Sequence, residues 1–163
     1  MTATYQSPVD TPIGVLTLVA SDVGLRRVLW PGQRAAVDGA VVDDHHPVLV
    51  AAAAQLSEYF AGDRRRFDLP LDLVGTDFQK QAWSALAEVP YGETSSYGEQ
   101  ARRIGRAGAF RAVGAANGKN PVPIVLPCHR IVGSDGSLTG FAGGLECKQR
   151  LLALERDQQS LDL

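Results

Sequence analysis

The sequence predicts an α+β protein in which a small α/β domain, residues 1–74, precedes a mostly helical domain, residues 75–163. Two observations predict this order. Short segments rich in Thr, Val and Leu alternate with turn residues in the first third of the chain, as in antiparallel sheets. Start and stop signals for helices fill the second half. The Pro-containing segment at residues 64–75 separates the two patterns, and we place the domain boundary at its end.

The first domain begins with three predicted strands. The segments ATYQSPV, GVLTLVA and GLRRVLWP carry strand-forming residues, and turn signals at residues 12–14 and 21–22 separate them. We therefore expect an antiparallel meander. A helix should follow over residues 46–62, with Pro47 near its start and Gly62 just after its end. Its expected buried face consists of Val50, Ala53, Ala54, Leu56 and Phe60.

The segment RRRFDLPLDLVG, residues 64–75, alternates apolar residues around Pro70. This pattern predicts either an extended connector or an edge strand, because proline is tolerated at the edges of sheets. Its three arginines follow a helix stop signal and lie among acids, so we expect a solvated surface there rather than a binding patch.

The second domain opens with a strong helix start signal. Thr76 and Gln79 have capping-box spacing immediately before DFQKQAWSALAEV, residues 77–89. The expected core face of this helix comprises Phe78, Ala82, Trp83, Leu86 and Val89.

Two shorter helices should follow. Ser96 and Glu99 form a second capping-box pattern before YGEQARRI, and AFRAVGAANG is a further helix that Gly118 ends. The turn at residues 105–108 contains two glycines. A short helix, a glycine-containing turn and a second short helix are typical of a helix-turn-helix.

The last of these helices is unusual for a DNA reader. Recognition helices present Arg, Asn or Gln to base edges, but this helix offers only Arg111 among small residues. Its candidates for exposure are Ala112, Gly114, Ala115 and Ala116. Two interpretations stay open: a helix whose backbone comes close to a partner without reading sequence, or a helix buried against a neighbour.

Charge limits the partners. The formal net charge is −2, which argues against a general polyanion binder. Between residues 94 and 133, however, six basic residues accompany a single acid, Glu99, so a polyanion fits this part of the chain.

The apolar run VLVAAAAQL is too short to span a bilayer, and MTATYQSPVD lacks the features of a signal peptide. We expect a cytoplasmic protein without a membrane partner.

The segment PVPIVLPCHRIVG, residues 121–133, carries the main chemical signal. Its apolar run at residues 124–126 predicts a buried strand that Pro127 ends, which places Cys128 at the strand end. A free thiol has a pKa of about 8.5 and needs a base to become a nucleophile. His129 is the candidate base, and Glu155 is the best carboxylate to orient it. The alternative is a buried structural cysteine.

Two further segments allow weaker interpretations. His45 and His46 lie beside Asp43 and Asp44, and these residue types can bind a metal, but a solvated loop explains them better. Cys128 and Cys147 lack zinc-finger spacing, and the chain lacks an export signal, so we expect both cysteines to be reduced thiols without a metal. The glycine-rich segment GSDGSLTGFAGG, residues 133–144, lacks the Lys-Ser/Thr ending of a P-loop. It is either a flexible wall beside the cysteine, with Phe141 able to stack on a flat ligand, or a plain surface loop.

The stretch NPVPIVLPCHRIVGSDGSLTGFAGGLECKQRLLALE closely resembles the O6-alkylguanine-DNA alkyltransferases, also called methylated-DNA–protein-cysteine methyltransferases. The resemblance extends through GTDFQKQAWSALAEVPYGETSSYGEQARRIG and RAVGAANGKNP, and TPIGVLTL is similar to the amino-terminal hairpin of that family. It implies a ribonuclease-H-like first domain and a winged-helix-like second domain. It also implies direct-reversal DNA repair: an alkyl group passes irreversibly from O6-alkylguanine, and from O4-alkylthymine, to the protein's own cysteine.

The resemblance assigns roles to individual residues. Cys128 would accept the alkyl group, His129 would act as its base through a water, and Glu155 would hold His129. Asn120 would brace the turn before the active-site segment, and Tyr97 would press on the target phosphate and help protonate the departing guanine. Arg111 would fill the duplex where the flipped base had been, with Ala112 and Gly114 against the minor groove. The remaining implied residues are Arg106 and Ser134 on DNA, and Phe141, Ala142 and Ile131 in the substrate pocket.

The implied partner is double-stranded DNA containing O6-alkylguanine, bound by a monomer, with cooperative binding on DNA as a further possibility. No cofactor is implied. Two departures affect the pocket, because Phe141 and Ala142 stand where relatives often have tyrosine and serine, and we expect altered preference among alkyl groups. The cysteines of the zinc site found in some relatives have no match here.

Three other functions would require features different from those of this sequence. A non-catalytic sensor of the alkyltransferase-like type would replace the reactive cysteine, whereas Pro-Cys-His-Arg is intact here. A helix-turn-helix transcription factor would need base-reading side chains on its second helix. A thiol hydrolase would turn over an ester or amide substrate.

Overall fold

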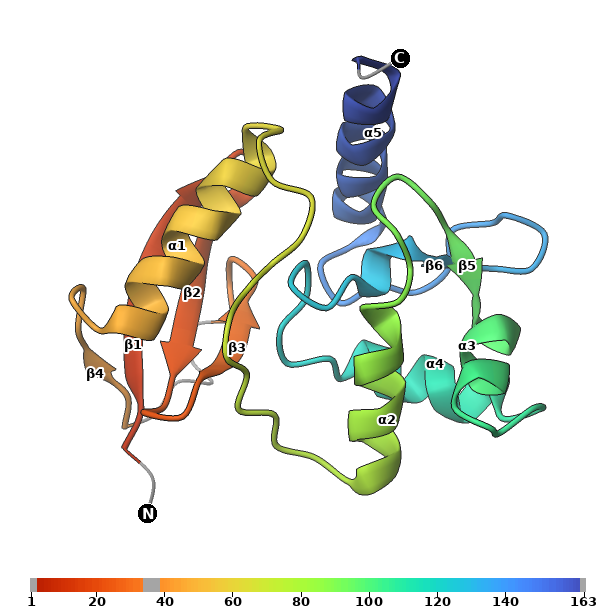
Figure 1. Ribbon diagram of the computed structural model, residues 1–163, viewed down its shortest axis with the longest axis horizontal. Helices are drawn as coiled ribbons and strands as arrows, with labels where there is room; N and C mark the ends of the chain where they lie inside the picture. The colour runs from red at the N-terminus through yellow and green to blue at the C-terminus, as the bar shows by residue number, and fades with distance from the viewer. Residues whose placement is uncertain (1–2, 34–38, 162–163) are drawn as a thin grey trace. The chain divides into compact units, whose positions relative to one another are not determined.

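The computed structural model describes residues 3–33 and 39–161, with the backbone alone at residues 159–161. The chain divides into two compact units, Met1–Val74 and Gly75–Leu163. A sheet with one helix forms the first unit and helices dominate the second, so the predicted α+β class is confirmed (Figure 1). In the part of the chain that the structure describes, no helix has the length and apolar character needed to cross a membrane.

The first unit is built on a four-stranded sheet with the order β3-β2-β1-β4. Its strands are β1 (Tyr5–Thr11), β2 (Gly14–Ala20), β3 (Leu25–Leu29) and β4 (Val41–Val42). The first three strands form the expected antiparallel meander, and β4 adds to β1 in parallel, which the sequence did not predict. Gly14 begins β2 with a φ of 110°, a backbone conformation that only glycine adopts readily.

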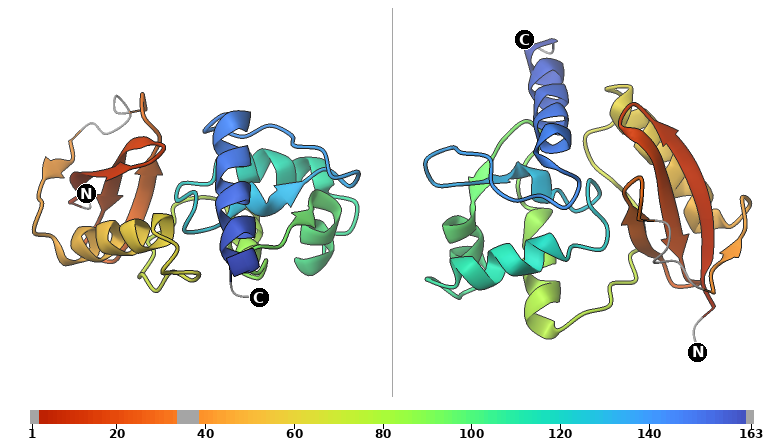
Figure 2. Two further views of the ribbon diagram at one scale, coloured as in Figure 1. Left: turned by 90° about the horizontal axis from the view of Figure 1, so that it is seen from above. Right: turned by 180° about the vertical axis from the view of Figure 1, so that it is seen from behind.

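Helix α1 (Pro47–Phe60) lies across one face of this sheet (Figures 1 and 2). His46 is its N-cap, because the imidazole Nδ1 accepts a hydrogen bond from the Val48 N–H at 3.3 Å. The predicted buried face was wrong except at Leu56. The residues that face the sheet are Leu49, Ala52, Leu56 and Tyr59. The run of alanines offers competing stripes at helical spacing, and only packing against the sheet decides between them.

The segment after α1 joins the edge of the sheet at one point. The Leu25 N–H donates to the Pro70 carbonyl at 2.8 Å, and the Asp72 N–H donates to the Leu25 carbonyl at 2.9 Å. The Asp72 carboxylate also accepts from the Ser21 hydroxyl at 2.6 Å and pairs with Arg26 at 3.1 Å. Of the two predicted alternatives, the extended connector describes this segment, which meets the sheet through a single bridge between Leu71 and Leu25.

The second unit begins with α2 and ends with the long helix α5. Its elements are α2 (Asp77–Leu86), β5 (Ser95–Ser96), α3 (Tyr97–Arg103), α4 (Phe110–Gly118), the 3-10 turn η2 (Cys128–Arg130), β6 (Ile131–Val132) and α5 (Leu145–Leu161). Both halves of the predicted capping box at Thr76 are present. Ser96 caps α3 through the Glu99 N–H, but the Glu99 carboxylate accepts from Ser95 at 2.8 Å.

Buried amides tie α2, α3 and α4 together. The side chains of Gln100 and Asn117 exchange hydrogen bonds of 2.9 and 2.8 Å, and Gln100 also donates to the Ala82 carbonyl. The Trp83 indole N–H donates to the Ala116 carbonyl at 2.7 Å. These bonds fix one face of α4 inward and leave its other face exposed, so α4 is neither fully buried nor free of the core.

Candidate active site

The segment before the cysteine is a turn, so the strand predicted at residues 124–126 was wrong. Prolines at positions 121, 123 and 127 remove donors that a strand needs. Ile124 has a φ of 73°, a left-handed conformation that is rare for a β-branched residue. Asn120 holds the turn, because its amide donates to the Leu126 carbonyl at 2.8 Å and its oxygen accepts from the Val122 N–H at 3.0 Å. Ile124 and Leu126 are nevertheless buried, as expected, whereas Val125 is half-buried.

Cys128 is the first residue of η2, directly before the short strand β6. Its side chain is buried, and burial raises the pKa of the thiol to about 11. A hydrogen bond with the Asn120 side chain and the charge of Lys148 act in the opposite direction, but burial outweighs both. In the free protein this sulfur is therefore a thiol at neutral pH, and it needs a base to react.

His129 and Glu155 lie side by side in the interior. The imidazole Nε2 is 2.6 Å from the Glu155 carboxylate, and both side chains are fully buried. The same carboxylate accepts from the Arg130 guanidinium at 2.9 and 3.1 Å and from the Gly92 N–H at 3.3 Å. Burial favours a raised pKa for Glu155, but the hydrogen bonds from His129 and Arg130 outweigh it and lower the pKa to about 2. Glu155 is an anion that only accepts.

This arrangement decides the tautomer of His129. Because the Glu155 carboxylate accepts, Nε2 carries the imidazole hydrogen and Nδ1 keeps its lone pair. Burial lowers the pKa of His129 more than the carboxylate raises it, so the ring is neutral. Among the described residues, Nδ1 has no hydrogen-bond partner. A neutral imidazole with an available lone pair is the form that a general base requires.

Lys148 is a buried charge that sequence reasoning missed. Its ammonium donates to the Ile131 carbonyl at 2.6 Å and to the Thr139 carbonyl at 3.2 Å, and it lies 5.8 Å from the Phe141 ring centroid. Burial lowers its pKa. Helical spacing places Lys148 on the same face of α5 as Leu151 and Glu155, which was the signal available in the sequence.

The glycine-rich loop at residues 133–144 lies beside β5 and the start of α3 (Figures 1 and 2). The hydroxyl groups of Tyr97 and Thr139 form a hydrogen bond of 2.7 Å. Of the predicted pocket residues, Ala142 is exposed, Phe141 is half-buried and Ile131 is fully buried.

The predicted DNA-binding residues are mostly exposed. Arg106, Arg111, Ala112 and Ser134 all reach solvent. Gly114 is half-buried against Tyr97, and a Cβ at this glycine would lie 3.7 Å from the tyrosine ring. The solvent-facing surface of α4 therefore consists of Phe110 at its start, one arginine and small residues.

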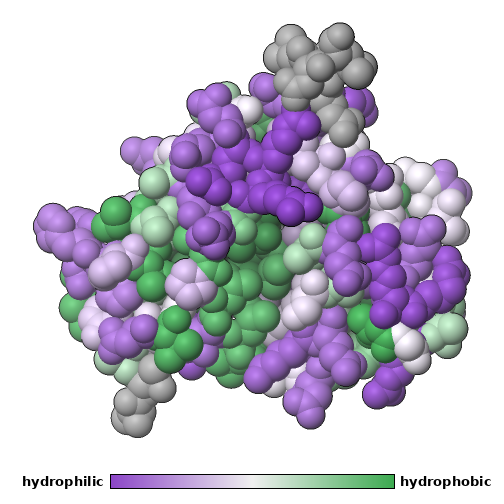
Figure 3. Space-filling view, in the orientation of Figure 1, coloured by the Kyte–Doolittle hydropathy of each residue, from purple (hydrophilic) through white to green (hydrophobic). Residues whose placement is uncertain are grey.

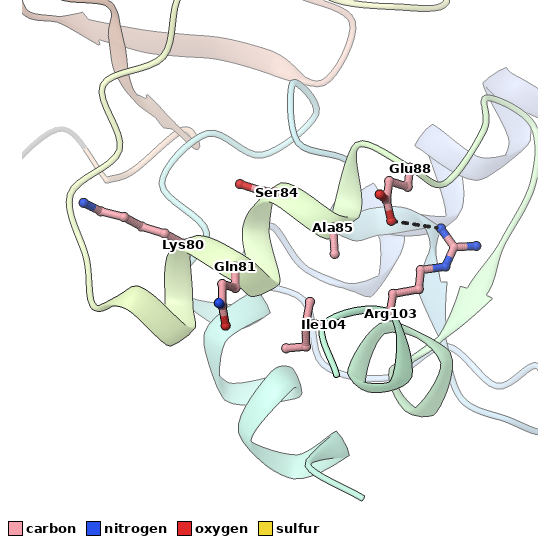
Figure 4. Close-up of a pocket in the computed structure, with 7 residues that line it drawn as sticks. All are labelled: Lys80, Gln81, Ser84, Ala85, Glu88, Arg103 and Ile104. Carbon is pink, nitrogen blue, oxygen red and sulfur yellow. Dashed lines mark ion pairs between the residues drawn. The ribbon is translucent and has the colours of Figure 1, made fainter. Parts of the chain in front are cut away.

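Two of the surface cavities formed by the described residues of this unit lie near the elements of the site. One, of about 430 Å³, lies between α2 and the end of α3, and the ion pair of Glu88 and Arg103 at 3.8 Å borders it (Figure 4). None of the predicted site residues lines it. The other, of about 510 Å³, is bordered by Glu155 and by residues of β6, the glycine-rich loop and α5.

Comparisons with known proteins agree over most of the chain. Residues 77–157 match the DNA binding domain of 6-O-methylguanine DNA methyltransferase, and residues 3–73 match its ribonuclease-like domain. A methylated-DNA–protein-cysteine methyltransferase of Mycolicibacterium paratuberculosis is 50% identical over 148 residues, which cover 91% of this chain and 90% of the relative. The corresponding protein of Methanosarcina barkeri is 45% identical, over 94% of this chain and 98% of its own. The crystal structure of Mycobacterium tuberculosis OGT in complex with DNA superimposes with a TM-score of 0.87 at 45% identity, over 94% of each chain.

Proposed function

The chain belongs to the 6-O-methylguanine DNA methyltransferase family of direct-reversal DNA repair enzymes, and from this premise we propose that Cys128 is its alkyl acceptor. The observation that carries the proposal is the arrangement of Cys128, His129 and Glu155. A buried thiol precedes a neutral imidazole whose Nδ1 is available, and a carboxylate holds the opposite nitrogen. This is a nucleophile, a base and a group that orients the base.

The proposed reaction is one displacement at carbon. The proton of the Cys128 thiol passes to Nδ1 of His129 through a water, and the resulting thiolate attacks the alkyl carbon. The S–C bond forms as the C–O6 bond breaks, and the electron pair stays with guanine, which takes up a proton with help from Tyr97. The Glu155 carboxylate stabilises the imidazolium that forms.

The product explains why one molecule acts once. A thioether has no hydrolytic route back to the thiol, and Cys128 is buried. The transfer needs neither a metal nor an organic cofactor in this scheme. We infer the same chemistry for O4-alkylthymine, because its alkyl group is also bound to an exocyclic oxygen of the base.

The exposed face of α4 fits a repair protein that reads no sequence. Small side chains let its backbone approach the minor groove, and Arg111 is placed to fill the space left by a flipped nucleotide. Arg102 and Arg103 of α3 are also exposed, and hydrophilic side chains gather over α2 and α3 (Figure 3). These charges suit the phosphate backbone. A monomer acting in the cytoplasm stays our prediction.

The test is intact mass and peptide mapping after the protein meets a slight excess of duplex containing O6-methylguanine. We expect one methyl group per chain, located on Cys128, no gain in Cys128→Ala, and an unchanged gain in the control Cys147→Ala. Tight binding to the lesion without a mass gain would indicate a sensor instead, and this alternative is not favoured by the intact Pro-Cys-His-Arg segment.

A further inference from the structure

Thr139 is held by two side chains that come from different helices. Its hydroxyl is 2.7 Å from the Tyr97 hydroxyl at the start of α3, and its carbonyl accepts from the Lys148 ammonium of α5 at 3.2 Å. Thr139 itself is exposed, in the middle of the glycine-rich loop. It therefore joins the start of the helix-turn-helix to a buried charge near Cys128.

We infer that Thr139 is a positioning residue for Tyr97, and that its hydroxyl holds the phenol where it meets the target nucleotide. This inference rests on the proposed function, in which Tyr97 helps to protonate the departing guanine. Thr139 acts on the reaction through Tyr97 and touches no reacting atom.

Two contacts define the orientation of the phenol. Gly114 of α4 lies against the ring, since a Cβ there would be at ordinary contact distance of 3.7 Å. Thr139 holds the other end, at the hydroxyl. A ring that has Gly114 beside it and is hydrogen bonded at its oxygen has less freedom, so we expect the phenol O–H to be aimed before DNA arrives.

The direction of the hydrogen bond follows from the chemistry. Each hydroxyl has one hydrogen and two lone pairs. If the Tyr97 hydrogen is to reach guanine, the hydrogen between the two residues must come from Thr139. A donated hydrogen bond then also stabilises the negative charge that builds on the phenol oxygen during the transfer.

Lys148 fixes the loop end of this arrangement. Its ammonium is buried and shares its hydrogen bonds between the carbonyls of Ile131 in β6 and Thr139 in the loop. The folded protein would be much less stable if the buried Lys148 ammonium lost its carbonyl acceptors. The Thr139 backbone is therefore held firmly, although the Thr139 side chain reaches the surface. The position of the loop relative to β6, and so to η2 and Cys128, is thereby fixed.

The experiment measures single-turnover transfer from O6-methylguanine duplex at saturating DNA. Thr139→Val keeps the shape and removes the hydroxyl, and Thr139→Ser keeps the hydroxyl. We expect Thr139→Val to slow transfer about tenfold and Thr139→Ser to stay within about twofold of the unaltered protein. Tyr97→Phe should be at least as slow as Thr139→Val, and the double variant no slower than Tyr97→Phe alone, because the hydroxyl of Thr139 acts only through the phenol.

Two readouts separate positioning from folding. The affinity for unmodified duplex and the urea midpoint of Thr139→Val should match those of the control Ser137→Ala, which removes a loop hydroxyl that bonds to Asp135 and not to Tyr97. An unaltered transfer rate in Thr139→Val, failure of Thr139→Ser to retain the rate, or multiplied effects in the double variant would each overturn the inference. Absence of methyl transfer in the unaltered protein would overturn the proposed function itself.

Discussion

The two units of the molecule differ in what they bury. Among the described residues, the buried polar side chains of the first unit are neutral hydroxyls and one histidine: Ser7, Thr17, Ser21 and His46. The second unit buries charged groups and their partners: His129, Arg130, Lys148 and Glu155. The first is organised by apolar packing of a helix on a sheet, whereas the second places ions in its interior.

This difference agrees with the proposal that the second unit carries the chemistry. Taking charges out of water costs several kcal/mol for each ion, and apolar residues of the same volume often stabilise a fold as well or better. The buried ions of the second unit are nevertheless concentrated around Cys128. Buried titratable groups with shifted pKa values cluster at functional sites, and here they lie on η2 and α5.

The largest effect is expected from Glu155→Gln. The change leaves Arg130 buried beside a neutral amide and removes the anion that orients His129. We expect a loss of about 3–5 kcal/mol in the free energy of unfolding, measured in urea at pH 7, and transfer below about 1% of the original rate. Glu146→Gln, at an exposed position in the same helix, is the control. A loss under about 1 kcal/mol would contradict the account of the buried ions.

A core change in the first unit should reduce stability alone. Leu18 of β2 is fully buried, so Leu18→Ala is expected to cost about 3 kcal/mol through lost packing and a cavity. The transfer rate per folded molecule should stay within about twofold. Val15→Ala, on an exposed position of the same strand, controls for strand propensity. A rate reduced tenfold in fully folded Leu18→Ala would show that the sheet takes part in the chemistry.

Acid should weaken the second unit through Glu155. Its pKa is about 2 in the folded protein against an ordinary value of 4.5, so its stabilisation is complete above pH 4.5 and is lost as pH falls through 2. The linkage relation gives a loss of about 2 kcal/mol between pH 7 and pH 3. The difference in unfolding free energy between the unaltered protein and Glu155→Gln should shrink accordingly in urea titrations. A constant difference across this range would exclude the proposed ionisation.

The smallest effect concerns the choice of alkyl group. Ala142 is exposed in the glycine-rich loop, and Ala142→Ser adds a donor beside the place where guanine would depart. One such hydrogen bond corresponds to roughly a fivefold rate change. The gain should be larger for methyl than for benzyl transfer, because the benzyl carbon is intrinsically more reactive. Ala87→Ser, exposed at the end of α2, is the control. An unchanged methyl-to-benzyl ratio would count against a role for this position.

Local signals predicted much of this fold and site. The cap at Thr76 and the antiparallel meander follow from short-range chemistry, and both appear in the structure. The pairing of His129 with Glu155 was predicted because these residue types complete a thiol site, and they are hydrogen bonded. The family and the repair function were predicted from the Pro-Cys-His-Arg segment and its surroundings, and the comparisons confirm both.

Features that depend on tertiary packing or on an unusual local backbone conformation were not predictable. The buried face of α1 is selected by the sheet, not by the alanine-rich helix itself. Ile124 adopts a left-handed conformation because the Asn120 side chain and the neighbouring prolines prevent a strand. Lys148 appears in the sequence as an ordinary surface lysine, and only the meeting of β6, the loop and α5 makes it an interior cation.

The hydrogen bond from Trp83 to the Ala116 carbonyl has a practical consequence for observing this protein. The chain has two tryptophans, Trp30 in the first unit and Trp83 in the second, and both are buried. Replacing either indole by phenylalanine leaves a single fluorophore that reports on one unit. Because Trp83 contacts the backbone of α4, its emission should also respond when DNA occupies the exposed face of that helix. Unfolding and lesion binding become visible by intrinsic fluorescence, without an attached dye.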